Sequence, residues 1–241
     1  MAFLITLAIT LTLAFLLRKP LKRVPLAFYA LALVACVASL WLFALPATER
    51  PILLNGLYFI MRRGYIALSL FTLVMFIGVF DESSLIRRAL NPTRAEYSII
   101  AAILIIGHFV PYLAGYLQQL MSPFPLRGSI AVSLTLSCAL LLLLTVLTVT
   151  SFNIVKQHMP PRAWRRLQRL SYLFFLLVYA HLSGFLLPAA LQGSPIALTS
   201  IIIYSLIFVS YTILRIRRSL KAHRSQPSRS LRSESPCAEH K

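Results

Sequence analysis

The pattern of hydrophobic positions along the chain consists of long apolar runs separated by short charged segments. An α-helix needs about 20 consecutive apolar residues to cross the hydrocarbon core of a bilayer. Seven runs come near this length, at about residues 2–17, 26–46, 64–80, 97–120, 128–152, 170–190 and 196–214. The pattern therefore predicts an all-α integral membrane protein with seven spans.

The composition of the chain supports this prediction. Hydrophobic residues make up 59% of the 241 residues, charged residues make up 12%, and the mean hydropathy is +0.79. These values are far from the balance of a soluble globular domain. We therefore expect the protein to lie in membrane lipid.

The Lys and Arg residues gather on every second connection. If the chain crosses the membrane seven times, 20 of the 24 Lys and Arg fall on one face, in segments 18–23, 87–94, 156–169 and 215–241. By the positive-inside rule this face is cytoplasmic, so the N-terminus lies outside and the C-terminus lies in the cytoplasm. The net charge of +18 is then explained by topology and by contact with anionic lipid, and no nucleic-acid partner is expected.

These features divide the chain into three parts. Residues 1–25 are expected to form an N-terminal transmembrane anchor and a basic loop, because no positive segment precedes the first run as it would in a signal peptide. Residues 26–218 are expected to form the helical bundle. Residues 219–241 are rich in Ser, Arg and Pro, which predicts a disordered basic cytoplasmic tail.

Two histidines lie inside apolar runs. His108 follows Arg94 by fourteen residues and His181 follows Arg169 by twelve, which places them ~21 Å and ~18 Å up their helices. The two imidazoles are therefore expected at nearly the same depth, in the outer half of the bilayer. A level pair on separate helices could hold one metal centre, and the usual centre in hydrocarbon is haem b with two axial nitrogens. The alternative for each is a packing histidine hydrogen-bonded to a neighbouring helix.

Other residues beside the histidines fit a cofactor site. Gly107 adjoins His108 and Gly184 lies about one turn beyond His181, so a flat ring could approach both backbones closely. On the outer face, Arg63 is a candidate partner for haem propionates, which accept charge-assisted hydrogen bonds. The alternative for Arg63 is a side chain that snorkels to the interface.

The stretch WRRLQRLSYLFFLLVYAH at residues 164–181, led in by a basic loop, resembles the penultimate helix of the ferric-reductase-like transmembrane family. The earlier order of an apolar span, an RRALNPTR loop and a helix carrying His108 is also similar to that family. The likeness covers about residues 60–215. Within the family, it is greatest to the haem-binding membrane subunits of periplasmic methionine sulfoxide reductase systems.

The resemblance implies a bundle of six core transmembrane helices, here the second to seventh spans, with the first span as an addition. It also implies b-type haem and electron transport across a cell inner membrane. His108 and His181 match the positions of the family's principal axial ligands. A further family histidine falls on Gln168 in this chain, so one haem is expected rather than two.

An electron donor and an acceptor are then expected to be separate molecules. The chain has no glycine-rich dinucleotide fingerprint and no soluble domain large enough for a flavin or nicotinamide site. We therefore expect the electron-transfer subunit of an oxidoreductase rather than a complete enzyme. A quinol or a flavoprotein would feed it, with bound FMN or quinone as an alternative bridge, and an outer-face protein or substrate would accept the electrons.

A second class of function is compatible with the same sequence. The chain could be a small-solute transporter or a structural subunit of a larger membrane complex, with the histidines as packing or proton-relay groups. No acidic residue lies within any predicted span, which counts against transport, and the level histidine pair counts against a purely structural role.

Overall fold

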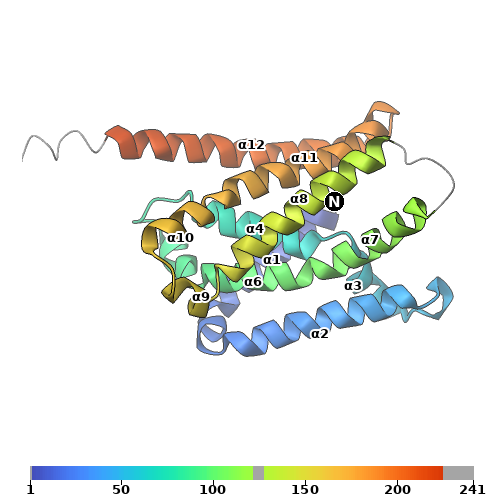
Figure 1. The fold of residues 1–241 in the computed structure, drawn as a ribbon, viewed down its shortest axis with the longest axis horizontal. Coiled ribbons are helices and arrows are strands. Elements are labelled where there is room, and N and C mark those ends of the chain that lie inside the picture. Colours follow the sequence, from blue (N-terminus) through green and yellow to red (C-terminus); the bar gives the residue numbers. More distant parts are fainter. Residues whose placement is uncertain (1, 122–127, 225–241) are drawn as a thin grey trace, which may run out of the picture.

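The structure is a computed structural model that describes residues 2–121 and 128–224. The described residues contain helices and no strands (Figure 1). The helices are α1 (Ala2–Arg23), α2 (Pro25–Ala44), η1 (Ala47–Glu49), α3 (Ile52–Arg62), α4 (Tyr65–Ile77), α5 (Leu85–Leu90), η2 (Asn91–Thr93), α6 (Arg94–Leu104), α7 (Ile106–Leu120), α8 (Gly128–Val149), α9 (Asn153–Gln157), α10 (Pro161–Gln168), α11 (Leu170–Leu191) and α12 (Pro195–Arg224).

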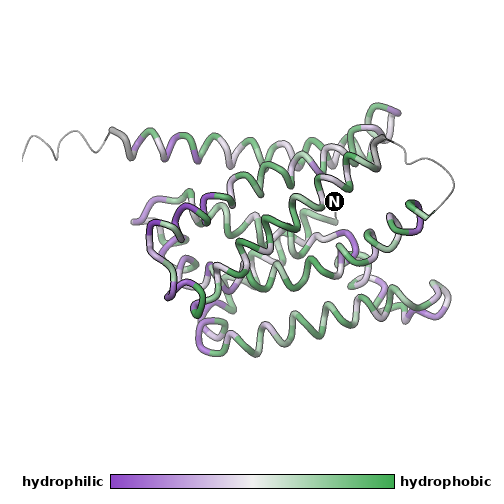
Figure 2. Tube along the Cα trace, viewed as in Figure 1, coloured by the Kyte–Doolittle hydropathy of each residue, from purple (hydrophilic) through white to green (hydrophobic). Residues whose placement is uncertain are grey.

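The predicted all-α membrane bundle is confirmed. Within the described residues, six helical stretches are long and apolar enough to cross a membrane, and α3 with α4 makes a seventh if this bent pair is one span. Figure 2 shows apolar residues along these helices and polar residues gathered near their ends. Large apolar side chains such as Leu26, Leu142 and Leu206 point outward, as a surface facing lipid tails allows.

The third span differs from the prediction. The sequence predicts one helix over 64–80 after an outer loop, whereas the structure has α3 in place of most of that loop and a 54° bend between α3 and α4. The bend lies at Gly64, whose φ of 69° is in the left-handed region that glycine adopts at no steric cost. With 13 residues, α4 is only ~20 Å long. If the bent pair is one span, α3 completes the crossing.

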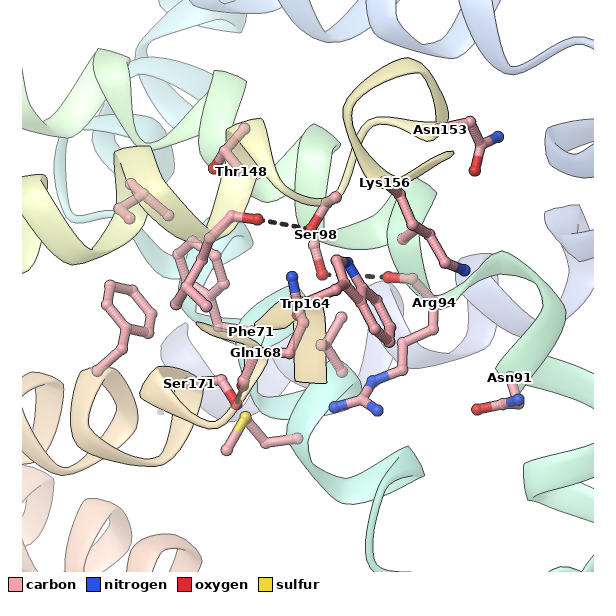
Figure 3. A pocket seen from close by; sticks show the side chains of 17 residues that line it. Phe71, Asn91, Arg94, Ser98, Thr148, Asn153, Lys156, Trp164, Gln168 and Ser171 are labelled. Carbon is pink, nitrogen blue, oxygen red and sulfur yellow. Dashed lines mark hydrogen bonds between the residues drawn. The ribbon is translucent and has the colours of Figure 1, made fainter. Parts of the chain in front are cut away.

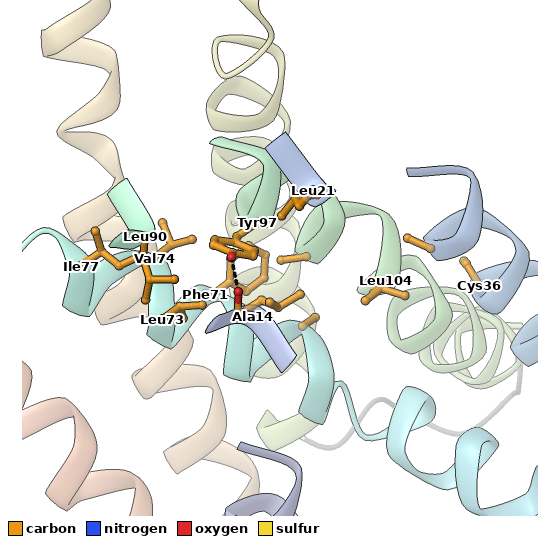
Figure 4. Close-up of a cluster of buried hydrophobic side chains, with 14 of the residues drawn as sticks. Ala14, Leu21, Cys36, Phe71, Leu73, Val74, Ile77, Leu90, Tyr97 and Leu104 are labelled. Carbon is orange, nitrogen blue, oxygen red and sulfur yellow. Dashed lines mark hydrogen bonds between the residues drawn. The ribbon is translucent and has the colours of Figure 1, made fainter. Parts of the chain in front are cut away.

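Helix α4 lies at the centre of the bundle. Its residues from Ala67 to Met75 are all buried, because α1, α6 and α11 pack around it. A helix that is apolar on every side requires such a position. Side chains of α4, α6 and α1 form much of the main apolar cluster, part of which is drawn in Figure 4.

Helix α1 packs into the bundle along its whole length. Its buried residues recur at helical spacing along one face and are Phe3, Thr6, Thr10, Ala14 and Leu21. The Tyr97 hydroxyl of α6 donates a hydrogen bond to the Ala14 carbonyl at 2.6 Å (Figure 4). Helix α1 is therefore long enough to span a membrane and shares the core with α4 and α6.

One end of the bundle, here called the basic end, carries residues 18–23, 87–94, 156–169 and 215–221. There α12 is tied to the loop after α4. Arg218 donates to the carbonyls of Gly78 and Phe80, and the Lys221 ammonium lies 2.9 Å from the Asp81 carboxylate. The hydrogen bond and the charge from Lys221 lower the pKa of Asp81 below its usual value. The basic segments meet at one end, and the cytoplasmic location of that end stays a prediction.

Helix α12 is longer than the sequence predicts. It continues to Arg224, so residues 219–224 are helical and not part of a disordered tail. Basic side chains near a helix C-terminus interact favourably with the helix dipole, and the last turns of α12 are rich in them. The rest of the predicted tail, residues 225–241, lies outside the described residues.

Candidate cofactor site

His108 lies in the first turn of α7, just after an irregular turn in the long helical stretch. The backbone N–H groups of His108 and Phe109 both reach the Ile105 carbonyl, at 3.0 and 2.8 Å. This shared acceptor marks the junction between α6 and α7. The junction turns the His108 side chain toward the bend between α3 and α4.

The His108 ring is held by a backbone carbonyl of that bend. Its Nδ1 lies 2.7 Å from the Arg62 carbonyl oxygen. A carbonyl oxygen can only accept a hydrogen bond, so Nδ1 carries the proton in the neutral ring and Nε2 keeps its lone pair. The Arg62 carbonyl is available because α3 ends at this residue and the chain turns at Gly64.

Gly64 is also the residue on which the His108 ring rests. A Cβ atom at Gly64 would lie 3.3 Å from Cγ of His108 and 3.2 Å from Cδ1 of Ile105. The left-handed turn at Gly64 therefore frees the Arg62 carbonyl, and the absence of a side chain at Gly64 makes room for the His108 ring.

His181 lies in the middle of α11, with its ring 5.1 Å from the Phe185 ring in an edge-on contact. Its Nδ1 is buried and makes no hydrogen bond. Within residues 2–121 and 128–224, its Nε2 has no hydrogen-bond partner either. Buried polar atoms in folded proteins nearly always have a partner, so a bare imidazole calls for an explanation.

The structure brings the two histidines near each other from different parts of the bundle. They lie close enough for the charge of one ring to act on the other. Helix α7 packs mainly on α2, α3 and α6, whereas α11 packs mainly on α8 and α12. No group of three or more His, Cys, Asp or Glu that could hold a metal ion occurs in the described part of the chain. A pair of imidazoles fits a centre that needs two axial nitrogens, such as haem, and does not fit a four-coordinate zinc site.

The other predicted site residues lie around this pair in different ways. A Cβ at Gly107 would meet Met61 and Ser39 at 3.0 and 3.4 Å, so Gly107 lets α7 approach α3 and α2. A Cβ at Gly184 would have no atom within 4 Å, so there is open space beside this residue. The Arg63 guanidinium lies 5.2 Å from the Phe59 ring. A cofactor-binding role for these three residues stays a prediction.

Arg62 and Tyr112 are further neighbours of His108, and both are candidates for the cofactor's surroundings from the sequence. The Tyr112 ring lies 4.9 Å from the His108 ring, and the Arg62 guanidinium lies 5.8 Å from the Tyr112 ring. The sequence signal for the bend is the Arg62-Arg63-Gly64 triplet, because a glycine at the start of an apolar run is typical of a helix break.

Two residues are relevant to whether the protein could bind a second haem. Gln168 donates from Nε2 to the Thr150 hydroxyl at 3.0 Å, so it serves as a hydrogen-bonding side chain at the basic end. His158 is exposed, and its Nδ1 lies 2.6 Å from the Ile154 carbonyl one turn earlier in the chain. A local partner of this kind satisfies the His158 ring without a cofactor.

Comparisons with known proteins give a family similarity. Residues 63–179 match the family described as ferric reductase like transmembrane component. An uncharacterized protein of Treponema pallidum (strain Nichols) is 40% identical to this chain over 153 residues, which cover 63% of this chain and 42% of that protein. The match thus spans less than half of the relative's length. No solved structure matches the chain. The family match indicates a membrane electron-transfer domain; it includes His108 and ends two residues before His181.

Proposed function

From the similarity to a ferric reductase-like transmembrane component, we propose that this protein is a cytochrome b-type electron-transfer subunit. It holds one haem b between His108 and His181 and relays electrons to an acceptor at the outer face of the membrane. It is one subunit of an oxidoreductase system in a bacterial-type inner membrane. Among such systems, the proposal is closest to the membrane subunits that serve periplasmic methionine sulfoxide reductases.

The state of the two imidazoles carries this proposal. A histidine that binds a metal usually donates its other ring N–H to a carbonyl or carboxylate, which fixes the ring and its tautomer. His108 makes such a bond to the Arg62 carbonyl at 2.7 Å and keeps Nε2 for a ligand. His181 has no hydrogen-bond partner in the described chain, so one of its two nitrogens is available as the second axial ligand.

Haem supplies one-electron redox chemistry when it is bound. The chain's own residues have three tasks around it. His108 and His181 hold it, the Arg62 carbonyl orients the His108 ring, and the apolar helices exclude water. Arg63, near the same bend, offers a cation for a propionate, and the open space beside Gly184 gives a ring access to α11.

Electron donors and acceptors complete the proposal. A quinol in the membrane or a flavoprotein at the cytoplasmic face feeds the site, with bound FMN or quinone as a bridge where distance requires one. The acceptor is a protein or substrate at the outer face. The direction rests on the basic end being cytoplasmic, as the positive-inside rule predicts.

A reduced-minus-oxidised visible spectrum of the detergent-purified protein tests this function. The wild type, expressed with ample haem, is expected to show a low-spin b-type α-band. His108→Ala and His181→Ala are each expected to lose that band, because each removes one axial nitrogen. His158→Ala is the matched control, since His158 is exposed and bonded locally, and it should keep the wild-type spectrum.

A colourless wild type would refute the proposal and favour a transporter or a structural subunit. Loss of the band in His158→Ala to the same extent as in the other two variants would show that the effect is not specific to the pair.

A further inference from the structure

A second polar site lies at the basic end, on the other side of the bundle's apolar core from the bend at Gly64. A cavity of about 270 Å³ is lined by residues of α4, η2, α6, α8, α9, α10 and α11 (Figure 3). Apolar side chains, among them Phe71, Val74 and Phe174, form one part of its wall. Arg94, Lys156 and Gln168 belong to the polar part. A cavity with both kinds of wall fits a molecule that has a polar head and an apolar body.

Arg94 is a cation of the cavity wall whose guanidinium has no hydrogen-bonding partner in the described residues. It is partly buried at the start of α6 and lines the cavity. Its guanidinium lies against the backbone of Gly78, where a Cβ atom would be 3.4 Å from Nη2. In the described chain this guanidinium makes no hydrogen bond and no ion pair. A partly buried cation without a partner is costly, because desolvation is not offset by an opposite charge.

The surroundings of Arg94 add positive charge. Arg87 and Arg215 lie within electrostatic range of it. The Arg87 guanidinium forms a salt bridge to the Glu82 carboxylate at 3.3 Å, and the Arg215 guanidinium lies 4.7 Å from the Tyr172 ring. Neither neighbour brings an anion to Arg94, so the local potential favours an anion at this position.

The wall opposite Arg94 is fixed by hydrogen bonds. Trp164 Nε1 donates to the Thr150 carbonyl at 2.9 Å, and Gln168 Nε2 donates to the Thr150 hydroxyl. The Lys156 ammonium lies 4.7 Å from the Trp164 ring, which places a second cation beside the cavity. The cavity thus combines two cations and a flat aromatic wall.

We propose that this cavity binds a phosphate-bearing amphiphile. The phosphate lies against Arg94 and Lys156, and the apolar or planar body lies against Phe71, Phe174 and Trp164. A guanidinium offers paired donors that match phosphate oxygens, and at the predicted inner membrane boundary phosphate is the common anion. The phosphate is that of an anionic phospholipid. This inference goes beyond the proposed function and does not depend on haem.

Tryptophan fluorescence tests the inference. The chain has two tryptophans, so Trp41→Phe leaves Trp164 as the only reporter, and Trp164 lines the cavity. The full-length Trp41→Phe protein in neutral detergent is titrated with phosphatidylglycerol, with FMN and with zwitterionic phosphatidylcholine as the control. A saturable change with phosphatidylglycerol, and none with FMN or with phosphatidylcholine, is expected.

Charge variants in the same background locate the anion. Arg94→Gln is expected to raise the half-saturating concentration by about tenfold to a hundredfold, the range for losing a hydrogen bond to a charged group. Arg162→Gln removes the same charge from an exposed position of α10 that does not line the cavity, and it should leave binding unchanged. Lys156→Gln, also at an exposed side chain, should weaken binding with little risk to the fold.

Two results would overturn the inference. One is the absence of a saturable response to phosphatidylglycerol, whether or not FMN gives one. The other is equal weakening in Arg94→Gln and Arg162→Gln, which would show diffuse attraction to the basic end. If Arg94→Gln fails to fold, Lys156→Gln and Arg94→Lys, which keeps the charge, decide the matter. The b-type spectrum of each sample is recorded in parallel, so failure here is separable from failure of the proposed function.

Discussion

At the scale of single residues, His108 depends on a backbone atom of a distant segment. The Arg62 carbonyl accepts from its Nδ1 at 2.7 Å, and Gly64 provides both the turn that frees this carbonyl and the space for the ring. The sequence is sufficient to predict the two histidines, because lone imidazoles in apolar runs are conspicuous. It is not sufficient to predict the Arg62 carbonyl, because every residue has one and only the chain break makes this one available.

Gly64→Ala is expected to disturb the site through this arrangement. A left-handed backbone costs a non-glycine residue about 1–2 kcal/mol, and the new Cβ would press on His108 Cγ at 3.3 Å. We expect a lower thermal midpoint and, in the haem-loaded protein, a changed midpoint potential.

Gly115→Ala is the matched control, because a Cβ there would have open space within α7 and alanine is the better helix former. Thermal unfolding and a redox titration of both variants give the comparison. Equal behaviour of the two variants would show that the Gly64 turn does not position His108.

At the scale of elements, the bent pair α3–α4 and the tie between α12 and the loop after α4 are the features that hydropathy does not show. The run 64–80 was predicted as one straight span because averaging over an apolar window takes no account of the backbone angle at Gly64. The stretch 47–63 was predicted as a loop because of its charges, yet residues 52–62 form α3. Helix α12 passes the predicted boundary at 219, where Arg218 bonds to loop carbonyls and Lys221 to the Asp81 carboxylate, contacts that sequence periodicity does not reveal.

The tie between α12 and the loop is expected to weaken in acid. The pKa of Asp81 is lower in the folded protein than in the unfolded chain, so its contribution is complete above the unfolded value of about 3.9 and is lost as the pH falls toward the folded value. The effect is small because both side chains are largely exposed.

Hydrogen exchange of residues 215–221 between pH 7 and pH 3, corrected for intrinsic rates, measures this weakening. The wild type should lose protection in the acidic part of the range, and Asp81→Asn should start from the weaker state and change less. Glu49→Gln, which removes a carboxylate from η1 far along the chain, should behave as the wild type. If Asp81→Asn lost as much protection in acid as the wild type, the loss would be due to the titration of another group.

At the scale of the whole molecule, the alternation of charged loops and apolar runs is sufficient to predict the bundle. Six described helical stretches and the bent pair correspond to the seven predicted runs, because membrane thickness fixes the length of each crossing. The packing order is a different matter. The burial of α4 on all sides and the insertion of α1 against α6 depend on contacts between residues far apart, such as Tyr97 with Ala14, and hydropathy does not contain this information.

Labelling of single cysteines tests the orientation of the bundle. In a variant whose three cysteines are replaced by serine, we introduce Ala47→Cys or Ser83→Cys, both at exposed positions. An impermeant maleimide should label Ala47→Cys in intact cells and Ser83→Cys only after lysis, because the positive-inside rule places the basic end in the cytoplasm. The reverse labelling pattern would invert the bundle and place the Arg94 cavity at the outer face.

The packing of α1 and α12 also limits how this scaffold can be exchanged between proteins. The stretch that matches the ferric reductase-like family is 63–179, yet the Tyr97 hydroxyl bonds to Ala14, before it. The Phe175 ring packs 4.3 Å from Phe208, after it. A chimera that grafts residues 63–179 onto foreign flanks would leave those partners behind and would omit His181. The matched segment and the packed bundle therefore have different boundaries, and a transplant that keeps these contacts must carry both terminal helices with it.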